Sequence, residues 1–256
     1  TLKTIGSEAF QGCTLLRFPK LPNNIDNIGS HAFSQCKNLG EITFPVNVSF
    51  GWGVFSSSTI SAIIWPEYDG EISIESEMFR DITGIDEITF PSYVTKIGSS
   101  AFNGAKIKKF DLSKMPEKGK ISTYAFRGSS ISEIIFPEKF SGIDSYAFAE
   151  CDGLESVVLP KEGLTTLGDH LFYMCSNLKS ATLPNSLTQI PDFCFSNCKI
   201  LTDIAVPDGI TSIGQEAFYN CCALSTFQMP SSLISIGSAA FANCTSLNDI
   251  NLPNGI

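Results

Sequence analysis

Residues 206–221 read VPDGITSIGQEAFYNC, and residues 183–198 read LPNSLTQIPDFCFSNC. Both stretches place an apolar residue five positions before a phenylalanine and a cysteine three positions after it. They begin 23 residues apart. Self-similarity at a fixed period of this length is the sequence signature of a repeat architecture, in which each repeat forms one unit of a solenoid.

The phenylalanine of this pattern returns every 22 to 24 residues along the whole chain of 256 residues. A glycine stands four positions before it in seven repeats, and a proline follows it by 11 to 14 positions in every repeat. Eleven of the twenty phenylalanines lie on this lattice: Phe10, Phe33, Phe55, Phe79, Phe102, Phe126, Phe148, Phe172, Phe195, Phe218 and Phe241. The spacing predicts one domain over residues 1–256, a single solenoid of about eleven repeats, and we expect it to be an excerpt of a longer chain.

The run L-P-x-x-L-x-x-I-G-x-x-A-F-x-x-C, found in both quoted stretches, resembles the BspA-like, or Treponema-type, subclass of leucine-rich repeats. The resemblance covers essentially the whole chain. It implies an α/β repeat fold, mostly β by content: a right-handed solenoid with a parallel β-sheet on its concave face. It also implies a cell-surface or secreted protein of bacteria or parasitic protists that binds a host matrix protein.

Elementary stereochemistry assigns a role to each column. The L-x-x-I-x-L/F segment alternates like a strand with one buried face, and the proline ends it because proline cannot donate to a β-ladder. The lattice phenylalanine should fill the interior. We expect the glycine to permit a tight or left-handed turn and the A-F-x-x-C piece to form one helical or 3₁₀ turn on the convex side.

Composition narrows the classes of function. Hydrophobic residues make up 43% of the chain, which allows a sizeable core. The net charge of −9 disfavours nucleic acid as a partner, since that affinity rests on Lys and Arg. No apolar stretch approaches the ~20 residues of a membrane helix, so no transmembrane segment is expected within this chain.

Sites for chemistry are not evident. Seven of the nine cysteines form a column three positions after the phenylalanine, and we interpret them as small buried thiols. His31 and His170 lie six coils apart on one convex stripe, about 29 Å at the strand spacing, and are interpreted as solvated. They cannot share a catalytic or metal site. We therefore expect no enzyme activity, no metal and no cofactor.

The outward columns of the concave strands are the candidate binding surface, because open concave faces are the usual binding surfaces of solenoids. Acids in one column never occupy adjacent coils, which relieves repulsion. Trp52 and Tyr68, off the lattice in the irregular segment 46–75, are further candidates for exposed contact. The candidate ligand-binding residues are Glu41, Thr43, Trp52, Ile64, Tyr68, Glu87, Thr89, Asp111, Glu133, Ile135 and Val158. A merely solvated sheet face, and drift within a repeat array, are the alternatives.

These patterns predict a non-enzymatic cell-surface or secreted binding module, adhesin-like, that recognises a protein or glycan, such as a host extracellular-matrix protein. A structural spacer that displays another domain is one alternative. An intracellular scaffold for protein interactions is another.

Overall fold

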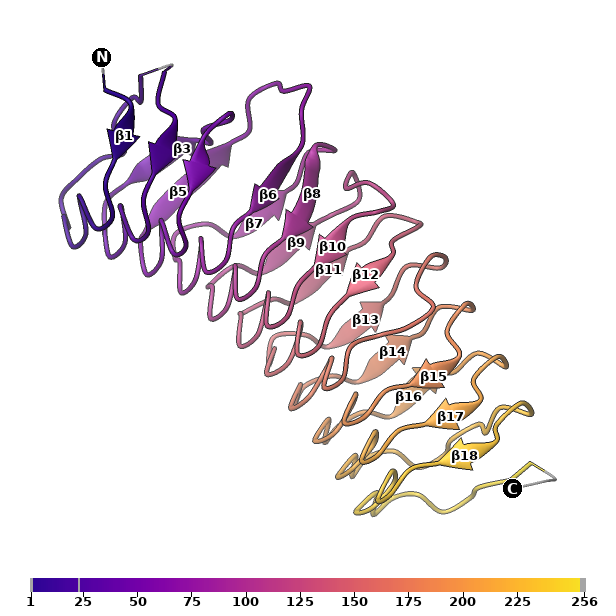
Figure 1. Cartoon of the computed structure of the whole chain (residues 1–256). Helices are drawn as coiled ribbons and strands as arrows, with labels where there is room; N and C mark the ends of the chain where they lie inside the picture. The colour runs from indigo at the N-terminus through magenta and orange to yellow at the C-terminus, as the bar shows by residue number, and fades with distance from the viewer. Residues whose placement is uncertain (1, 23, 254–256) are drawn as a thin grey trace.

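The computed structural model describes residues 2–22 and 24–253, and the chain forms an elongated solenoid of stacked coils (Figure 1). Two rows of parallel strands run along it. Face A contains the strands predicted from the L-x-x-I-x-L/F segment. They are β3 (Gly40–Thr43), β5 (Ile60–Ile64), β7 (Glu87–Thr89), β9 (Lys109–Asp111), β11 (Glu133–Ile135), β13 (Ser156–Val158), β14 (Ser180–Thr182) and β16 (Asp203–Ala205).

Face B is a second row that the sequence did not predict, and most of its strands end at the apolar residue five positions before the lattice phenylalanine. They are β1 (Thr4–Ile5), β2 (Asn27–Ile28), β4 (Ser49–Phe50), β6 (Ile72–Ile74), β8 (Val94–Ile97), β10 (Lys120–Ile121), β12 (Gly142–Ile143), β15 (Gln189–Ile190), β17 (Ser212–Ile213) and β18 (Ser235–Ile236). The expectation of one sheet was therefore incomplete. Neighbouring coils pair through strands on both faces, and each face is divided into three successive parallel sheets.

The register of both faces aligns the repeats. On face A, β7, β9 and β11 pair so that Ile88, Phe110 and Ile134 stand side by side. On face B, Ile97, Ile121 and Ile143 are direct partners in β8, β10 and β12. Because parallel strands with aligned registers keep equivalent residues in one line, the columns read from the sequence become physical columns.

The interior confirms the phenylalanine lattice. Each of the eleven rings stacks on the ring of the next coil, with centroids 5.2 to 5.8 Å apart and planes within 18° of parallel. Nine of the eleven, from Phe33 to Phe218, are fully buried. A continuous ring stack therefore forms the axis of the core, and the branched side chains of faces A and B pack around it.

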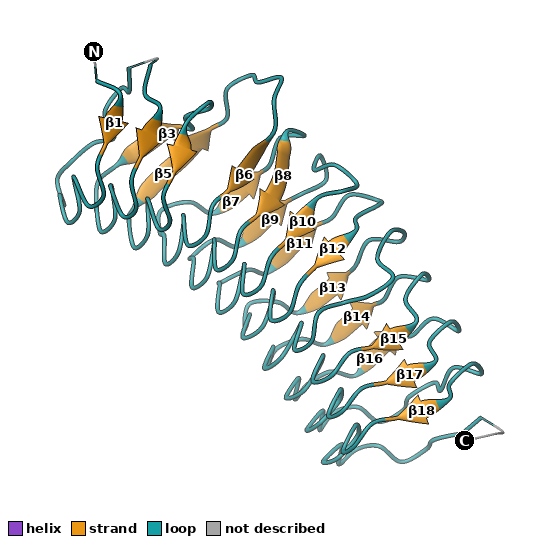
Figure 2. Cartoon of the chain, viewed as in Figure 1, coloured by secondary structure: helices purple, strands orange, loops and turns teal. Residues whose placement is uncertain are grey.

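The turn side, which connects face B to face A around the phenylalanine, contains no helix in the described residues (Figure 2). The expected helical or 3₁₀ turn was wrong. His170 and Met174, on either side of Phe172, both have a left-handed backbone with φ of 58°. Their N–H groups donate to the next coil, at Asp192 O and Ser196 O, both 2.9 Å away. A helix needs consecutive right-handed residues with bonds along its own chain, so this alternation excludes one.

The lattice glycines do not have the left-handed backbone that we expected. Their φ values are not positive, whereas non-glycine residues two positions before and after the phenylalanine do carry positive φ. A Cβ on Gly168 would lie 2.1 Å from the backbone nitrogen of Ser145 in the preceding coil, and one on Gly237 would lie 2.5 Å from that of Gln215. The glycine column is therefore required by close approach between coils.

The cysteine column is confirmed as a column of unpaired thiols, most of them buried. Each buried thiol of the column donates to the carbonyl oxygen of a lattice phenylalanine in the preceding coil; Cys175 Sγ lies 3.0 Å from Phe148 O. Cys221 Sγ likewise lies 3.2 Å from Phe195 O. The thiol thus supplies a second donor to a buried carbonyl, which stabilises the stacking of coils.

Candidate functional site

Face A presents nine of the eleven predicted ligand-binding residues. The register places Glu87, Lys109 and Glu133 in one column, and Thr89, Asp111 and Ile135 in the column beside it. The same two columns continue at the start of the array, where Glu41 faces Ala62 and Thr43 faces Ile64, and further along at Val158. The prediction that these side chains share one surface is thus supported by the pairing.

Charges alternate along the first column. Lys109 Nζ lies 3.0 Å from Glu87 Oε1, and the lysine stands between the two glutamates. The hydrogen bond to Glu87 raises the pKa of Lys109, and the charges of Glu133 and Asp111 raise it further. Because each of these groups is largely solvated, the network orients side chains and gives the face a pattern of charge, while its contribution to stability is small.

Aliphatic side chains interrupt this polar surface. Ile64 is 47% exposed and Val158 is 61% exposed, while Ile135 is half-buried between them along the column. An aliphatic side chain exposed on the outer side of a strand is not covered by the rest of its own coil. Face A therefore combines exposed apolar side chains with oriented charges.

Trp52 and Tyr68 lie elsewhere. Trp52 is on the turn side, where its ring meets His31 edge-on with centroids 4.4 Å apart, and it is 54% exposed. Tyr68 is in the loop that follows β5, where its hydroxyl donates to Asn47 Oδ1 at 2.9 Å and its ring packs edge-on against Tyr93. These two residues were predicted as exposed contacts of the irregular segment, and Trp52 is indeed exposed, but they lie apart from each other and from face A.

The two histidines do occupy one column of the turn side, but they are not simply solvated as predicted. His170 is stacked between Tyr146 and Phe193, with centroids 4.2 and 4.4 Å away, and burial lowers its pKa. His31 contacts Trp52, and its Nδ1 lies 3.3 Å from Ser56 Oγ. Neither histidine has a nucleophile and a carboxylate in contact with it, which a catalytic triad requires.

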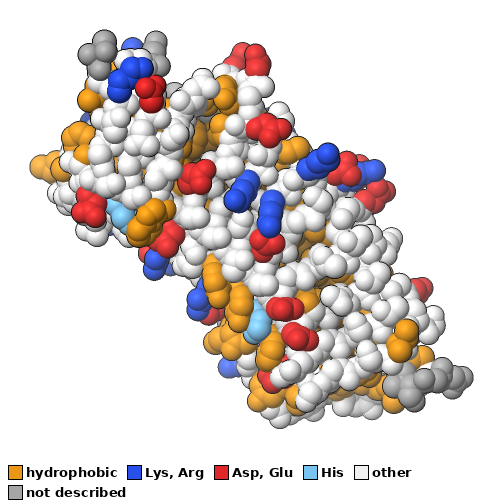
Figure 3. Space-filling view, viewed as in Figure 1, with side chains coloured by type: hydrophobic (Ala, Val, Ile, Leu, Met, Phe, Trp, Pro, Cys, Tyr) orange, Lys and Arg blue, Asp and Glu red, His pale blue; other side chains and the backbone are white. Residues whose placement is uncertain are grey.

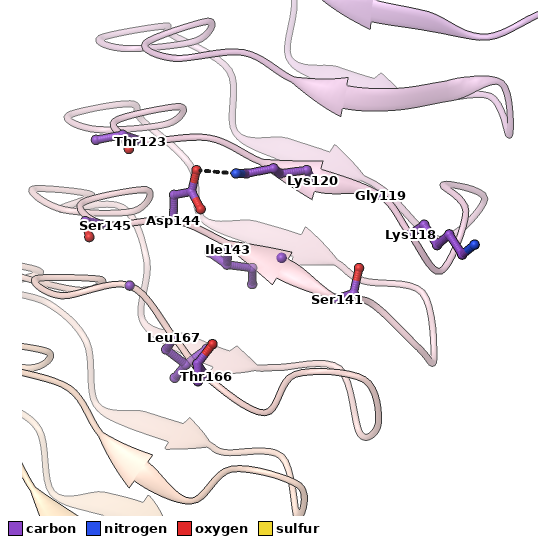
Figure 4. A pocket seen from close by; sticks show the side chains of 12 residues that line it. Lys118, Gly119, Lys120, Thr123, Ser141, Ile143, Asp144, Ser145, Thr166 and Leu167 are labelled. Carbon is purple, nitrogen blue, oxygen red and sulfur yellow. Dashed lines mark ion pairs between the residues drawn. The ribbon is translucent and has the colours of Figure 1, made fainter.

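A groove on face B was missed by the sequence reading. It occupies about 490 Å³ across β10 and β12 and the coil that follows them. Figure 4 shows Lys120 reaching Asp144 across it, with a separation of 3.1 Å between Nζ and Oδ2. Lys118, Thr123 and Ser145 lie along its sides. The groove exists because Gly142 and Gly168 bring no side chain to its floor.

A second groove of about 470 Å³ repeats this shape further along face B, at equivalent positions around β15, β17 and β18. Asp169 and Asp192 line it, and neither Lys nor Arg does. The glycines that line the grooves, such as Gly168 and Gly214, could have revealed both of them in the sequence. The charged residues that line each groove could have revealed how the two differ. No group of three or more His, Cys, Asp or Glu is arranged to hold a metal ion within the described ranges.

The described part of the chain has no helix that is long and apolar enough to cross a bilayer.

Comparison with known proteins places the chain. Among curated proteins, none matches it significantly in sequence. It is similar to the solved leucine-rich repeat protein of Bacteroides ovatus, with 23% identity over 99% of this chain and 71% of that one and a TM-score of 0.65. It is also similar to the T. pallidum leucine-rich repeat protein, with 26% identity over 64% of this chain and 78% of that one and a TM-score of 0.58.

A third solved structure, that of the pneumococcal vaccine antigen PcpA, shares the fold at 22% identity, over 92% of this chain and 60% of that one, with a TM-score of 0.54. The model of the BspA type leucine-rich repeat region matches residues 3–119, 48–179 and 165–256, in six copies. Together these matches span nearly the whole chain and agree with the observed coil. The chain belongs to the BspA-type leucine-rich repeat family.

Proposed function

We propose that this chain is a non-enzymatic binding module, exposed at a cell surface or secreted, that recognises a protein ligand through face A. The observation that carries the proposal is the combination of exposed aliphatic residues and an oriented charge column along one row of parallel strands, which forms three successive sheets. Leucine-rich repeat arrays typically act as scaffolds for protein interaction, and the fold shared with a pneumococcal vaccine antigen supports the surface location.

Rigidity favours recognition on this face. The strands of face A are held by inter-coil backbone hydrogen bonds, and their inward side chains pack on the phenylalanine stack. A surface that is already ordered loses little conformational entropy when a partner binds. A standard protein interface covers about 800 Å² of each partner, an area that several adjacent coils of a strand face can supply.

The residues with the largest expected effect are the exposed aliphatic ones, because apolar groups at the centre of an interface are desolvated on binding. The charge column should set the orientation of the partner and its rate of association, and reversal of one charge would place like charges together. Val158→Asp and Glu87→Lys therefore probe the two components of the surface separately.

The test is solid-phase binding to immobilised extracellular-matrix proteins such as collagen and laminin. We expect Val158→Asp and Glu87→Lys each to weaken binding at least tenfold, with an unchanged melting temperature. Ile234→Asp is the matched control, because Ile234 is 72% exposed and outside the strands of face A. Binding that survives both face A substitutions, or that is lost equally in the control, would contradict the proposal.

One observation favours a second candidate function, that of a stiff spacer holding another domain. The phenylalanine stack runs without a break from Phe10 to Phe241, and inter-coil hydrogen bonds accompany it throughout. Replacing several coils with a flexible linker distinguishes the spacer from the binding module. A spacer would lose its function because its stiff length is lost. A binding module would lose its function only if the replaced coils carry the binding residues of face A.

A further inference from the structure

We propose that the first groove of face B, together with Lys96 beside it, binds the carboxylate or sulfate groups of an acidic polysaccharide. This site is separate from face A and does not depend on the protein ligand proposed for that face. Four observations carry the inference: lysines without an ion-pair partner, two lysines in direct register, the chemistry of the groove, and its acidic counterpart.

Lysines without an ion-pair partner gather in the middle coils. Residues 96–139 hold nine Lys and Arg and four Asp and Glu. Five of the nine cations pair with acids of adjoining coils, which leaves Lys96, Lys106, Lys114 and Lys118 without an ion-pair partner among the described residues. Figure 3 shows Lys and Arg side chains at the middle of the visible face with Asp and Glu side chains close to them, and side chains of both signs toward the N-terminal end. An anionic ligand is therefore favoured beside the lysines that lack an ion-pair partner, and Lys96 and Lys118 are the two nearest the first groove.

Two lysines of this region lie side by side on neighbouring strands. Lys96 and Lys120 are direct partners in the register of β8 and β10, so both side chains leave the sheet on the same face about 4.8 Å apart along the array. Like charges directly opposite each other are destabilising. Asp144 pairs with Lys120 and offsets part of this repulsion, but Lys96 and Lys118 have no ion-pair partner among the described residues. A bound anion would supply a partner for these two lysines.

The groove beside them suits a sugar chain. Its walls carry hydroxyl groups from Thr123, Ser141, Ser145 and Thr166, and the isoleucine and leucine of its floor are buried. Hydroxyl groups and an Asp–Lys pair can exchange hydrogen bonds with sugar hydroxyls, while exposed glycine backbone lets a chain approach closely. An apolar ligand would find little surface to bury here.

The second groove identifies charge as the selective feature. It has nearly the same volume and equivalent lattice positions, yet two aspartates and no lysine line it. A ligand recognised by shape and hydroxyl groups alone would occupy both grooves. An acidic ligand would occupy the first and be excluded from the second.

A polysaccharide fits better than a nucleic acid. Tyr124 and Tyr146, which adjoin the groove, pack against each other at a tilt with centroids 4.9 Å apart. The Arg127 guanidinium lies over the Tyr124 ring at 5.5 Å and His170 stacks on Tyr146 at 4.2 Å, so these ring faces are not free to stack on bases. Single-strand binding relies on such free faces. Acidic residues at both ends, including Glu75 and Asp169, also limit an anionic chain to a few coils, on the order of 15 Å at the strand spacing.

Binding is measured by titration calorimetry at low salt with heparin as the sulfated probe and polygalacturonate as the carboxylated probe. Dextran is the neutral control, and oligo-dT and polyglutamate represent the other polyanions. We expect one of the two acidic glycans to bind more tightly than all three comparison probes, with an affinity that falls as salt screens the charges.

The variants locate the site. The double variant Lys96→Gln, Lys118→Gln should weaken glycan binding at least tenfold, while Lys108→Gln, an exposed lysine paired with Asp86 and outside the groove, should not. Asp169→Lys with Asp192→Lys should create a second site in the second groove. All four positions are exposed, so the melting temperature should stay within a few degrees.

The proposal would be overturned by tighter binding of oligo-dT or polyglutamate than of either glycan, by equal affinity for all polyanions, by absence of glycan binding, or by equal effects of Lys108→Gln and the groove variant. The double lysine variant should bind the face A ligand normally, and Val158→Asp should bind the glycan normally. The two proposals therefore fail independently.

Discussion

The regular coils of residues 151–244 and the irregular segment 46–75 keep the same interior with different chemistry. In the regular coils, Cys221 Sγ donates to the carbonyl of Phe195 at 3.2 Å. In the irregular segment, Ser58 occupies the equivalent position, and its hydroxyl donates to the carbonyl of Phe33 at 2.7 Å. Either a thiol or a hydroxyl can donate at this position, while Ile82 and Ala105 fill it in the next two coils without a side-chain donor.

The exteriors of the two regions differ far more. The irregular segment places Trp52 on the turn side and Tyr68 in the loop beside Tyr93, while Phe44 and Trp65 pack at a tilt within its core. The stack itself continues unchanged, with Phe55 and Phe79 5.6 Å apart and Phe195 and Phe218 5.4 Å apart. The comparison teaches that drift is confined to the surface, because only the interior must match both neighbouring coils.

The largest expected effect on stability comes from removing a stacked phenylalanine, and it tests whether the two regions have equivalent interiors. Phe195→Ala and Phe55→Ala should each lower the free energy of unfolding by about 3–5 kcal/mol, since both remove a fully buried ring from a packed core. Trp52→Ala, at a position that is 54% exposed in the irregular segment, is the control and should cost far less. Urea unfolding measures all three. A small loss for Phe55→Ala alone would show that the irregular segment has a looser interior.

A smaller effect tests the glycine column. Gly168→Ala places a Cβ against the backbone of Ser145 and should cost about 1–3 kcal/mol, because the backbone cannot move aside as a flexible side chain could. Gly6→Ala is the matched control, since no atom lies within 4 Å of the new Cβ. Thermal melting compares the two. Equal stability would refute the role assigned to close approach between coils.

The smallest effect concerns the thiols of the regular coils. Burial raises the pKa of Cys151 to about 12 in the folded protein, from about 9 when unfolded. A raised folded pKa stabilises the fold fully below pH 9, and this stability is lost as the pH rises from 9 through 12. Cys151→Ser should therefore reduce the decline of stability in this window by about 1.4 kcal/mol per pH unit.

The control for the thiol prediction is Cys13→Ser, because Cys13 is exposed. Its slope of stability against pH should equal that of the unmodified chain. Urea unfolding at several pH values between 8 and 11 measures the slopes. An unchanged slope in Cys151→Ser would mean that this thiol does not titrate with unfolding.

Much of the candidate site followed from counting residues. The prediction that Glu87, Lys109 and Glu133 share a column was confirmed by the strand pairing. Trp52 and Tyr68 were predicted only as exposed contacts of the irregular segment, because they lie off the lattice, where counting gives no direction for a side chain; their neighbours, His31 and Tyr93, came from the structure. The groove of face B was missed because its key feature is an absence of side chains at Gly142 and Gly168, combined with a lysine from the coil before them.

The sequence by itself determined the period, the buried phenylalanine stack, the unpaired thiols and the parallel order of the strands, because each depends on one residue type recurring at one spacing. The tertiary structure decided the second sheet face, the left-handed residues that replace a helix, the close contact that requires glycine, and the pairing of Lys96 with Lys120. The reason is physical: these features arise between residues more than 20 positions apart, whose contacts exist only after the coils have stacked.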